Sequence, residues 1–247
     1  MTRPIGVLAT QLRAELRLVS RNGEQLLLTL GIPILLLGFF SLVDVLPTPA
    51  GTDEPVDFLA PGILALAVMS TAMVSLGIGT GFERSYHVLK RLGATPPGRG
   101  RLIAAKIISV VCVELVQFAI LVPVAYALGW RPDGPHWPVA AGGVVVGTVA
   151  FAGIGLTLAG RLRGEINLAA QNGLYLVLLL LGGMVIPFAE LPDVVRAIAY
   201  VLPSGALADV LRDSSGGGAT NAGRSWLVLA AWAVAAPLAA SRLFRWD

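Results

Sequence analysis

Long apolar runs alternate with short polar connections along the chain. A helix needs about 20 mostly apolar residues to cross the roughly 30 Å hydrocarbon core of a bilayer. Six runs meet or approach this length, so the pattern predicts an all-α integral membrane protein with six transmembrane helices. The expected spans are residues 26–46, 58–82, 102–128, 139–159, 168–187 and 226–240.

The residues before the first run are amphipathic. Apolar residues from Ile5 to Val19 follow one helical stripe, while arginines recur every four residues on another face. This pattern is typical of a helix that lies in the membrane interface, and a membrane span follows it directly. We therefore expect an interfacial amphipathic helix over residues 1–25. The alternative interpretation is an ordinary solvated N-terminal helix.

A different pattern precedes the last run, in residues 188–225. Two short apolar stretches, residues 194–201 and 205–211, are introduced by Pro192 and Pro203. Neither stretch is long enough to span the membrane. They predict short re-entrant helices at the outer face, which a membrane tolerates only where protein or a water-filled cavity covers the backbone.

The composition supports a membrane protein. Of the 247 residues, 55% are hydrophobic and 13% are charged, and the mean hydropathy is +0.77. Soluble domains carry about 25% charged residues. No connection between the runs is long enough for a soluble domain, so we expect residues 1–247 to form a single transmembrane domain.

The basic residues determine the expected orientation. Fourteen of the 18 lysines and arginines fall in the two tails and around the second and fourth connections, and four fall on the other side. Cytoplasmic segments carry an excess of basic residues. Both termini and residues 83–101 are therefore expected to face the cytoplasm, in a multi-pass protein of a bacterial-type plasma membrane. The pI near 9.4 then reflects topology and anionic lipid, and nucleic acid is not an expected partner.

The sequence lacks motifs for catalysis. The two histidines, His87 and His136, fall on opposite sides of the expected topology and form no paired-histidine metal motif. No Walker loop is present, and serines inside the runs have no histidine or lysine partner at comparable depth, which disfavours an intramembrane enzyme. The single cysteine, Cys112, excludes an intramolecular disulfide. We expect no catalytic residue, no metal site and no cofactor bound by this chain.

Glu114 is an ionisable residue inside the third run. It lies about 12 residues from the start of the run, roughly 18 Å deep at 1.5 Å per residue, and an intramembrane acid suggests a functional site. Gln117 shares its helical face, so the pair fits a translocation path and a structural hydrogen bond between helices equally well. If Glu114 is an ion or proton site, the alternative function is an ion-coupled secondary transporter or a channel.

The fifth run carries a polar stripe. Asn167, Gln171 and Tyr175 recur at i, i+4 and i+8. Such a stripe is costly against lipid, so it faces either a neighbouring helix or an aqueous translocation path. Two small-xxx-small spacings, Gly77 to Gly81 and Gly143 to Gly147, permit close helix approach, and we assign them to packing.

A basic segment, "ERSYHVLKRLGATPPGRGR", separates the second and third runs at residues 83–101. From Glu83 about three helical turns are possible, with one apolar edge and a basic last turn, and the following prolines end the helix. The apolar edge predicts a helix that docks onto another protein, and the alternative is a connecting loop anchored by its positive charge. The edge consists of Tyr86, Leu89 and Leu92, and the basic residues are Lys90 and Arg91.

Several motifs follow one another in a specific order. The second expected span opens with "FLAPGIL". Next comes a run of the form E-R-x-x-x-x-L-x-x-L-x-x-T-P, which is followed by a lysine in the third span. The segment before the last span reads "GGMVIPFAELPDVVRAIAYVLPSGALADVLRD". This order resembles the membrane permeases of type-2 ATP-binding cassette (ABC) exporters. His87 and Ala105 depart from that family, which carries glycine at both positions. The matching positions of the basic segment are Glu83, Arg84, Leu89, Leu92, Thr95, Pro96 and Lys106.

The resemblance implies a permease that works with separate ATPase subunits. Two ATPase copies would bind ATP and Mg, and a second permease, identical or similar, would complete the path. Residues 83–92 would form the coupling helix that seats in a cleft of the ATPase. The low aromatic content of 7% favours a hydrophobic drug or lipid, moved outward, as substrate. The residues implied in ATPase coupling are Glu83, Arg84, Tyr86, Leu89, Lys90, Arg91, Leu92, Thr95 and Pro96.

Overall fold

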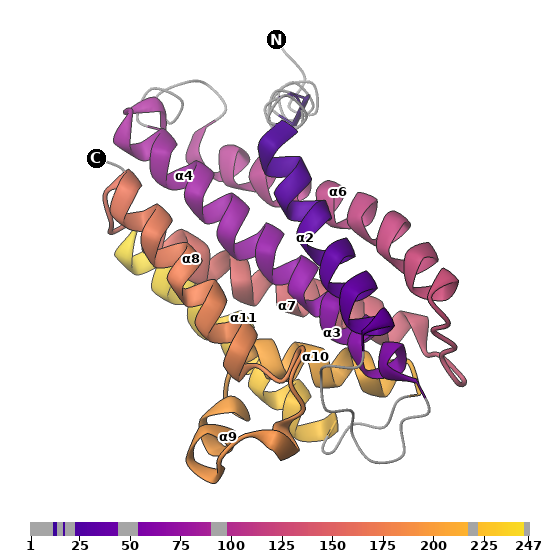
Figure 1. Ribbon diagram of the computed structural model, residues 1–247. Helices are drawn as coiled ribbons and strands as arrows, with labels where there is room; N and C mark the ends of the chain where they lie inside the picture. The colour runs from indigo at the N-terminus through magenta and orange to yellow at the C-terminus, as the bar shows by residue number, and fades with distance from the viewer. Residues whose placement is uncertain are drawn as a thin grey trace.

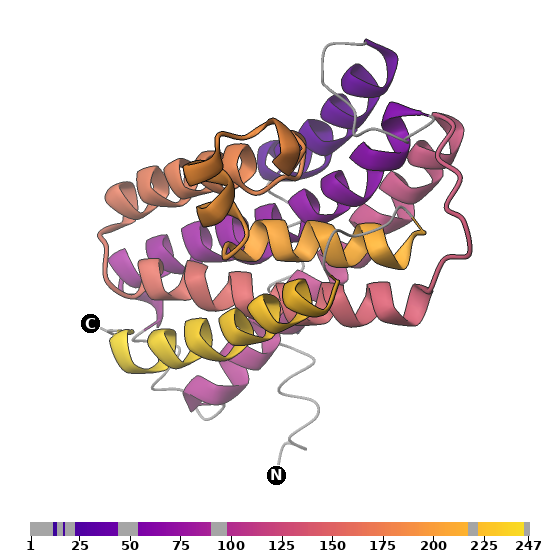
Figure 2. The same ribbon diagram turned by 90° about the horizontal axis from the view of Figure 1, so that it is seen from below.

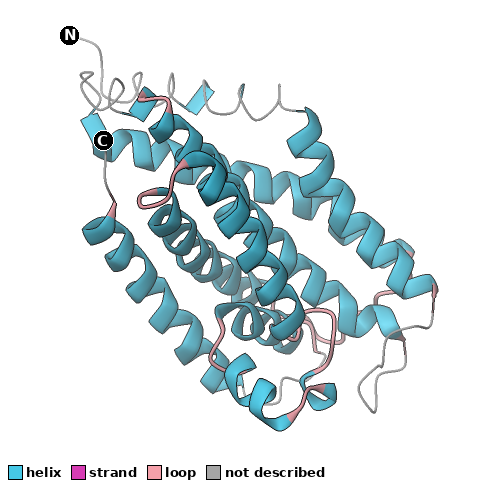
Figure 3. Ribbon diagram, turned by 60° about the vertical axis from the view of Figure 1, so that its left-hand side comes forward, coloured by secondary structure: helices cyan, strands magenta, loops and turns pink. Residues whose placement is uncertain are grey.

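The computed structural model describes residues 12, 13, 17, 23–43, 54–89, 98–216 and 222–244, with the backbone alone at 24–28 and 98–103. All regular elements in these residues are helices, as Figure 3 shows. They are α2 (Gly23–Leu42), α3 (Pro55–Met69), the π-helix η1 (Ser70–Ser75), α4 (Leu76–Ser85), α6 (Gly98–Ala127), α7 (Trp137–Ala159), α8 (Gly164–Leu181), the 3-10 helix η2 (Phe188–Glu190), α9 (Asp193–Ala199), α10 (Pro203–Ser214) and α11 (Ala222–Leu243).

The predicted all-helical membrane fold is confirmed. Each of the six predicted runs contains a helix. In the first run this helix is α2, which includes the shorter apolar stretch Thr29–Leu42. Five further stretches of the described residues are long and apolar enough to cross a membrane: Pro55–Ser85, Ala104–Ala127, Trp137–Ala159, Gly164–Leu181 and Ala222–Leu243.

The fifth span is shorter than its apolar run. α8 ends at Leu181, whereas the run continues to Pro187. Gly182 is the C-terminal cap of the helix, and Gly183 has a φ of +62°. Glycine adopts this left-handed conformation without steric cost and commonly ends helices. The apolar residues after Gly183 therefore leave the helix and lead toward α9.

The spans form a bundle around α3, η1 and α4, which join end to end as the most buried span. α2, α7 and α8 pack around this span, α11 packs along α7, and α10 packs on α3, α7 and α11. The start of α2, the end of α4 and the end of α11 lie at one end of the bundle, and α9 and α10 lie at the opposite end (Figure 1). Figure 2 shows α10 beside α11 from below.

The central span contains a π-helix, η1, which the apolar pattern did not predict. Gly155 of α7 packs directly on it, because an added Cβ atom there would overlap the carbonyl oxygen of Met73. Thr71 of η1 is buried and donates a hydrogen bond to a side chain of α6 at 2.8 Å. The π-helix therefore contacts both α6 and α7.

Both small-xxx-small spacings serve close packing, as predicted. Added Cβ atoms at the first pair would collide with side-chain amides of α8, and those at the second pair with apolar side chains of α10. Helices approach this closely only where small residues leave room for the neighbour. Gly77 and Gly81 face Gln171 and Asn167, and Gly143 and Gly147 face Val210 and Leu207.

The two short helices predicted in residues 188–225 are present as α9 and α10. Pro192 is the N-cap of α9 and Pro203 is the first residue of α10, a position where the missing N–H has no helical partner to lose. The two helices meet at 77°, the geometry of a broken span or a re-entrant loop. The predicted interfacial helix over residues 1–25 lies almost wholly outside the described residues and stays a prediction.

Candidate functional site

An ion pair joins the end of α4 to α6. Lys106 Nζ lies 2.7 Å from Glu83 Oε1, and both side chains are largely buried. Charges in a membrane protein are costly unless they are paired. Glu83, the first residue of the basic segment, and Lys106, which follows the segment, are therefore direct partners.

Arg84, the next residue, binds the end of α7. Its guanidinium donates hydrogen bonds to the carbonyl oxygens of Gly160 at 2.7 Å and Leu162 at 2.8 Å. The last carbonyl groups of a helix lack intrahelical partners, and arginine offers several donors in one plane. The hydroxyl of Ser85 accepts a hydrogen bond from the N–H of Gly164 at the start of α8. Three consecutive residues thus connect α4 to α6, α7 and α8, and we call this contact the α4 junction.

The predicted continuous helix from Glu83 is wrong within the described residues. α4 ends at Ser85, and Tyr86 and His87 form a turn. His87 has a φ of +58°, in the left-handed region that favours glycine, and it stands where the resembled family carries glycine. The turn separates Tyr86 from Leu89, which are 68% and 2% exposed, so the two side chains do not form one docking edge.

The described part of the basic segment exposes an aromatic side chain. The Tyr86 ring stacks on Phe82 of α4, with ring centroids 6.2 Å apart. An exposed tyrosine suits a protein contact, because it combines a large apolar ring with a polar tip. The other predicted coupling residues, Lys90, Arg91, Leu92, Thr95 and Pro96, lie outside the described residues, and their role stays a prediction.

Glu114 lies buried between α6 and α7. Thr148 Oγ1 is 2.8 Å and 3.0 Å from its two carboxyl oxygens, and 2.8 Å from the carbonyl oxygen of Val144. A hydroxyl carries one hydrogen and donates to one of these acceptors at a time. The contact agrees with a structural hydrogen bond between helices, and a role in the translocation path stays a prediction.

Gln117 supplies a hydrogen-bond donor that the backbone of α2 lacks. Pro33 lacks an N–H, so the carbonyl of Thr29, four residues earlier, loses its helical donor. Gln117 Nε2 donates to that carbonyl at 3.0 Å, and its Oε1 accepts from Thr71 at 2.8 Å. One side chain thereby joins α6 to α2 and η1, which supports the structural alternative for this residue.

The polar stripe of α8 contacts neighbouring helices. Asn167 donates to the carbonyl of Gly77 in α4, and Gln171 donates to the carbonyl of Gly155 in α7, each at 2.9 Å. Both amides are fully buried, whereas Tyr175 is half-buried against the apolar core. The structure therefore contains the helix contact that the stripe suggested, and a path along the stripe stays a prediction.

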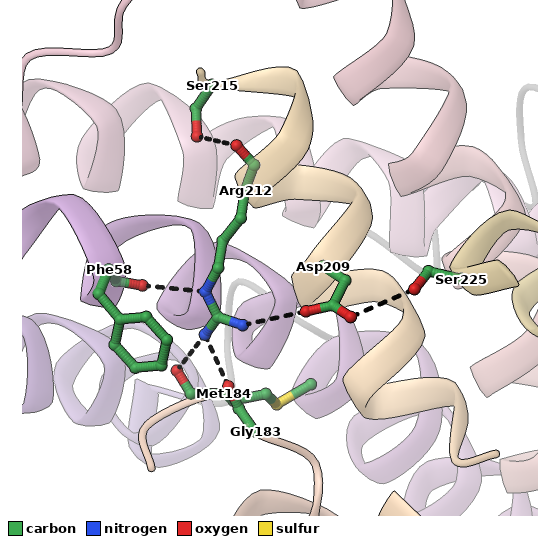
Figure 4. A network of polar contacts seen from close by, with 7 residues as sticks. All are labelled: Phe58, Gly183, Met184, Asp209, Arg212, Ser215 and Ser225. Carbon is green, nitrogen blue, oxygen red and sulfur yellow. Dashed lines mark hydrogen bonds and ion pairs between the residues drawn. The ribbon is translucent and has the colours of Figure 1, made fainter. Parts of the chain in front are cut away.

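Arg212 of α10 forms a buried network that the sequence patterns did not single out (Figure 4). Its guanidinium lies 3.5 Å from Asp209 and 3.9 Å from the centre of the Phe58 ring. One cation thus joins α10 to the start of α3 and to the chain after α8. An arginine three residues after an aspartate in an apolar helix is the signal that indicates such a pair. The carbonyl acceptors of Arg212 are Phe58 at 3.3 Å, Gly183 at 2.6 Å and Met184 at 3.1 Å.

Two sequence comparisons relate this chain to known transport proteins. A family model described as ABC-2 type transporter matches residues 7–214. The chain belongs to the ABC-2 type transporter family. It is also 28% identical over 203 residues, 81% of this chain and 82% of the relative, to a Bacillus subtilis (strain 168) protein named "Putative transport permease YvfS". The chain is therefore a transporter permease with several membrane-spanning helices.

The α4 junction contains three charged residues of the motif by which the sequence resembles ABC exporter permeases. These residues are Glu83, Arg84 and Lys106, and all three contact other parts of the permease itself. They hold the end of α4 in place, and the turn at Tyr86 and His87 projects from that fixed point. We therefore describe the three charged residues as positioning residues.

Breaking the ion pair of the α4 junction should destabilise the permease. Lys106→Gln removes the cation that lies 2.7 Å from the Glu83 carboxylate at a mostly buried site, which should lower the free energy of unfolding by about 2 to 4 kcal/mol. The double variant Glu83→Gln/Lys106→Gln removes both charges and should recover part of this loss. The free energies of unfolding of the wild type, both single variants and the double variant, measured in mixed detergent micelles, form a double-mutant cycle. A double variant that loses the sum of the two single losses would show that the pair contributes no coupling energy.

Arg212→Gln should lower the free energy of unfolding by about 3 kcal/mol or more, because buried carbonyl groups and Asp209 lose their partner. Arg196→Gln is the matched control. Arg196 also donates to backbone carbonyls and lies 3.5 Å from an aspartate, but its side chain is 34% exposed and that of Arg212 is 7% exposed. Water can replace the contacts of Arg196, so its loss should be about 1 kcal/mol or less. Equal losses in the same unfolding assay would contradict the assignment.

Proposed function

We propose that this permease is the membrane subunit of an ATP-driven exporter and works with a separate ABC ATPase. The observation that carries the proposal is the exposed turn at Tyr86 and His87, which projects from a junction bound to α6, α7 and α8. Close-packed protein transmits displacement because it is nearly incompressible. A partner that pushes on this turn would therefore move the central span and its neighbours together.

The proposed assembly contains two ATPase subunits, which bind ATP and Mg, and two permeases, identical or similar. Closure of the ATPase pair would press on the turn of each permease. α2 and α8 expose large apolar side chains such as Leu35 and Leu176. These surfaces suit contact with lipid or with the second permease.

We also propose that the substrate is a hydrophobic drug or lipid that moves outward. The walls of the bundle are apolar, and the low aromatic content of 7% offers few rings for stacking on sugars. α10 is anchored at the far end of the bundle by Arg212. Release of substrate at that end would require α10 or the chain after α8 to shift, because the network joins them.

The α4 junction is proposed to face the cytoplasm of a bacterial-type plasma membrane, with both termini on the same side. Arg84, Arg161 and Arg163 gather around the junction, between the end of α4 and the start of α8. Cytoplasmic ends of membrane proteins carry such an excess of basic residues. The connection between α9 and α10 would then face outward.

Thiol labelling tests this orientation in a Cys112→Ala background. Asp193→Cys at the start of α9 should react with a membrane-impermeant thiol reagent added to intact cells, because the Asp193 side chain is almost fully exposed. Arg161→Cys, in the exposed connection between α7 and α8, should react only after the cells are opened. The reverse pattern would invert the topology.

Substitution of Tyr86 tests the ATPase contact. Tyr86→Asp places a charge on the exposed turn, and the lost burial of a large side chain is worth about 1.5 to 3 kcal/mol, so ATPase binding should weaken about tenfold or more. The permease is purified from its own organism, and co-purified ABC ATPase is quantified by mass spectrometry.

Val194→Asp is the control for Tyr86→Asp. Val194 is likewise an exposed apolar residue, but it lies on α9 at the opposite end of the bundle. This variant should retain the ATPase. If both variants retain ATPase equally, the turn is not the contact, and the proposed coupling site is wrong.

A further inference from the structure

A partly open cavity lies between α4, α6, α7 and α11, in the half of the bundle that holds the α4 junction. Its volume is about 420 Å³, within the range of about 300 to 1,000 Å³ common for small-molecule pockets. Leu76, Val110 and Ala152 line its inner part. Thr148 also lines the cavity, but its hydroxyl is hydrogen-bonded to Glu114 or to the carbonyl of Val144. Because the other side chains of this part are apolar, it favours an apolar ligand group.

The end of the cavity nearer to the α4 junction carries polar groups. Thr80, Lys106 and Ser241 line it there. Lys106 is paired with Glu83 at 2.7 Å, so the two charges compensate each other. The cavity therefore matches a ligand with an uncharged polar head at this end and an apolar chain directed inward.

Thr80 has a buried hydroxyl group that lacks a partner. Its side chain is 3% exposed, and Oγ1 forms no hydrogen bond within the part of the chain that the structure describes. Thr157 of α7, by contrast, donates to the carbonyl four residues earlier at 2.7 Å. A buried polar group without a partner lowers stability. A hydrogen bond from the head of a bound ligand would satisfy the Thr80 hydroxyl.

The wall of the cavity includes exposed side chains of α6 and α7. Ile107 and Val149 belong to its wall and are 39% and 40% exposed. Their exposed neighbours on the same helices, Val111 and Val145, are also apolar, as expected of a surface that faces lipid. A molecule dissolved in the bilayer can therefore reach the cavity from the side.

We propose that this cavity binds a neutral single-chain amphiphile, of the monoacylglycerol type, that enters from the bilayer. The head forms a hydrogen bond with the Thr80 hydroxyl, and the chain lies along Val110 and Ala152. The site belongs to the permease alone, so its binding does not depend on the proposed ATPase. Leu89 also lines the cavity, and the ligand thus touches the segment that follows the turn after α4.

Photolabelling of the purified permease in nanodiscs tests the proposal. The probe is a monoacylglycerol with a diazirine in its chain, and labelled residues are located by mass spectrometry. Saturable labelling near Val110 and Ala152, displaced by unlabelled monooleoylglycerol, is the expected result. Thr80→Val keeps the side-chain shape and should weaken binding about two- to tenfold. Thr157→Val is the control and should leave binding unchanged, because Thr157 does not line the cavity.

Val149→Trp tests the opening. The large side chain fills the wall between α6 and α7 and should abolish saturable labelling. Val145→Trp is the matched control, since Val145 is exposed one turn earlier on α7 and is not part of the cavity wall. Labelling that does not saturate, or whose affinity is unchanged in both Val149→Trp and Thr80→Val, would overturn the site. Equal displacement by a diacyl phosphatidylglycerol would overturn the neutral single-chain ligand.

Discussion

Hydrocarbon offers no hydrogen-bond partner, so polar groups that this permease buries in the membrane have to be satisfied inside the chain. The requirement is visible at Pro33, which leaves the carbonyl of Thr29 to be bound by Gln117 from another helix. The same requirement joins Arg84 to carbonyls after α7 and Arg212 to carbonyls after α8. Polar side chains in the bundle therefore connect one helix to the backbone of another, and the arrangement of the spans follows from where these connections form.

Charged side chains connect both ends of the central span to other helices. At one end Glu83, Arg84 and Ser85 bind α6, α7 and α8, and at the other end Arg212 binds the start of α3 to α10. A close-packed span that is held at both ends transmits displacement between them. η1 lies between the two ends, and π-helices occur frequently at functional sites. A change in the shape of the central span is therefore expected at η1.

The cavity beside α4 contains one of several exceptions to this pattern among the described residues. Thr80 keeps a buried hydroxyl without a partner in the described residues, whereas Thr148 and Thr157 of α7 both form hydrogen bonds. The wall of the cavity includes Leu89, which follows the turn at His87. A ligand in the cavity and an ATPase at the turn would contact the same short segment. Any effect that one of them had on the affinity of the other would be reciprocal.

The sequence by itself determined the features that depend on local pattern: apolar length placed the spans, prolines marked the starts of α9 and α10, and glycine spacing marked close helix approaches. The tertiary structure alone decided which polar residues meet, such as Glu83 with Lys106, and which carbonyls Arg212 binds. It also decided that Leu89 is buried, because the left-handed turn at His87 redirects the chain after α4. Periodicity reports the environment of each residue along one helix, whereas these contacts join residues far apart in the chain, and only the packed bundle brings them together.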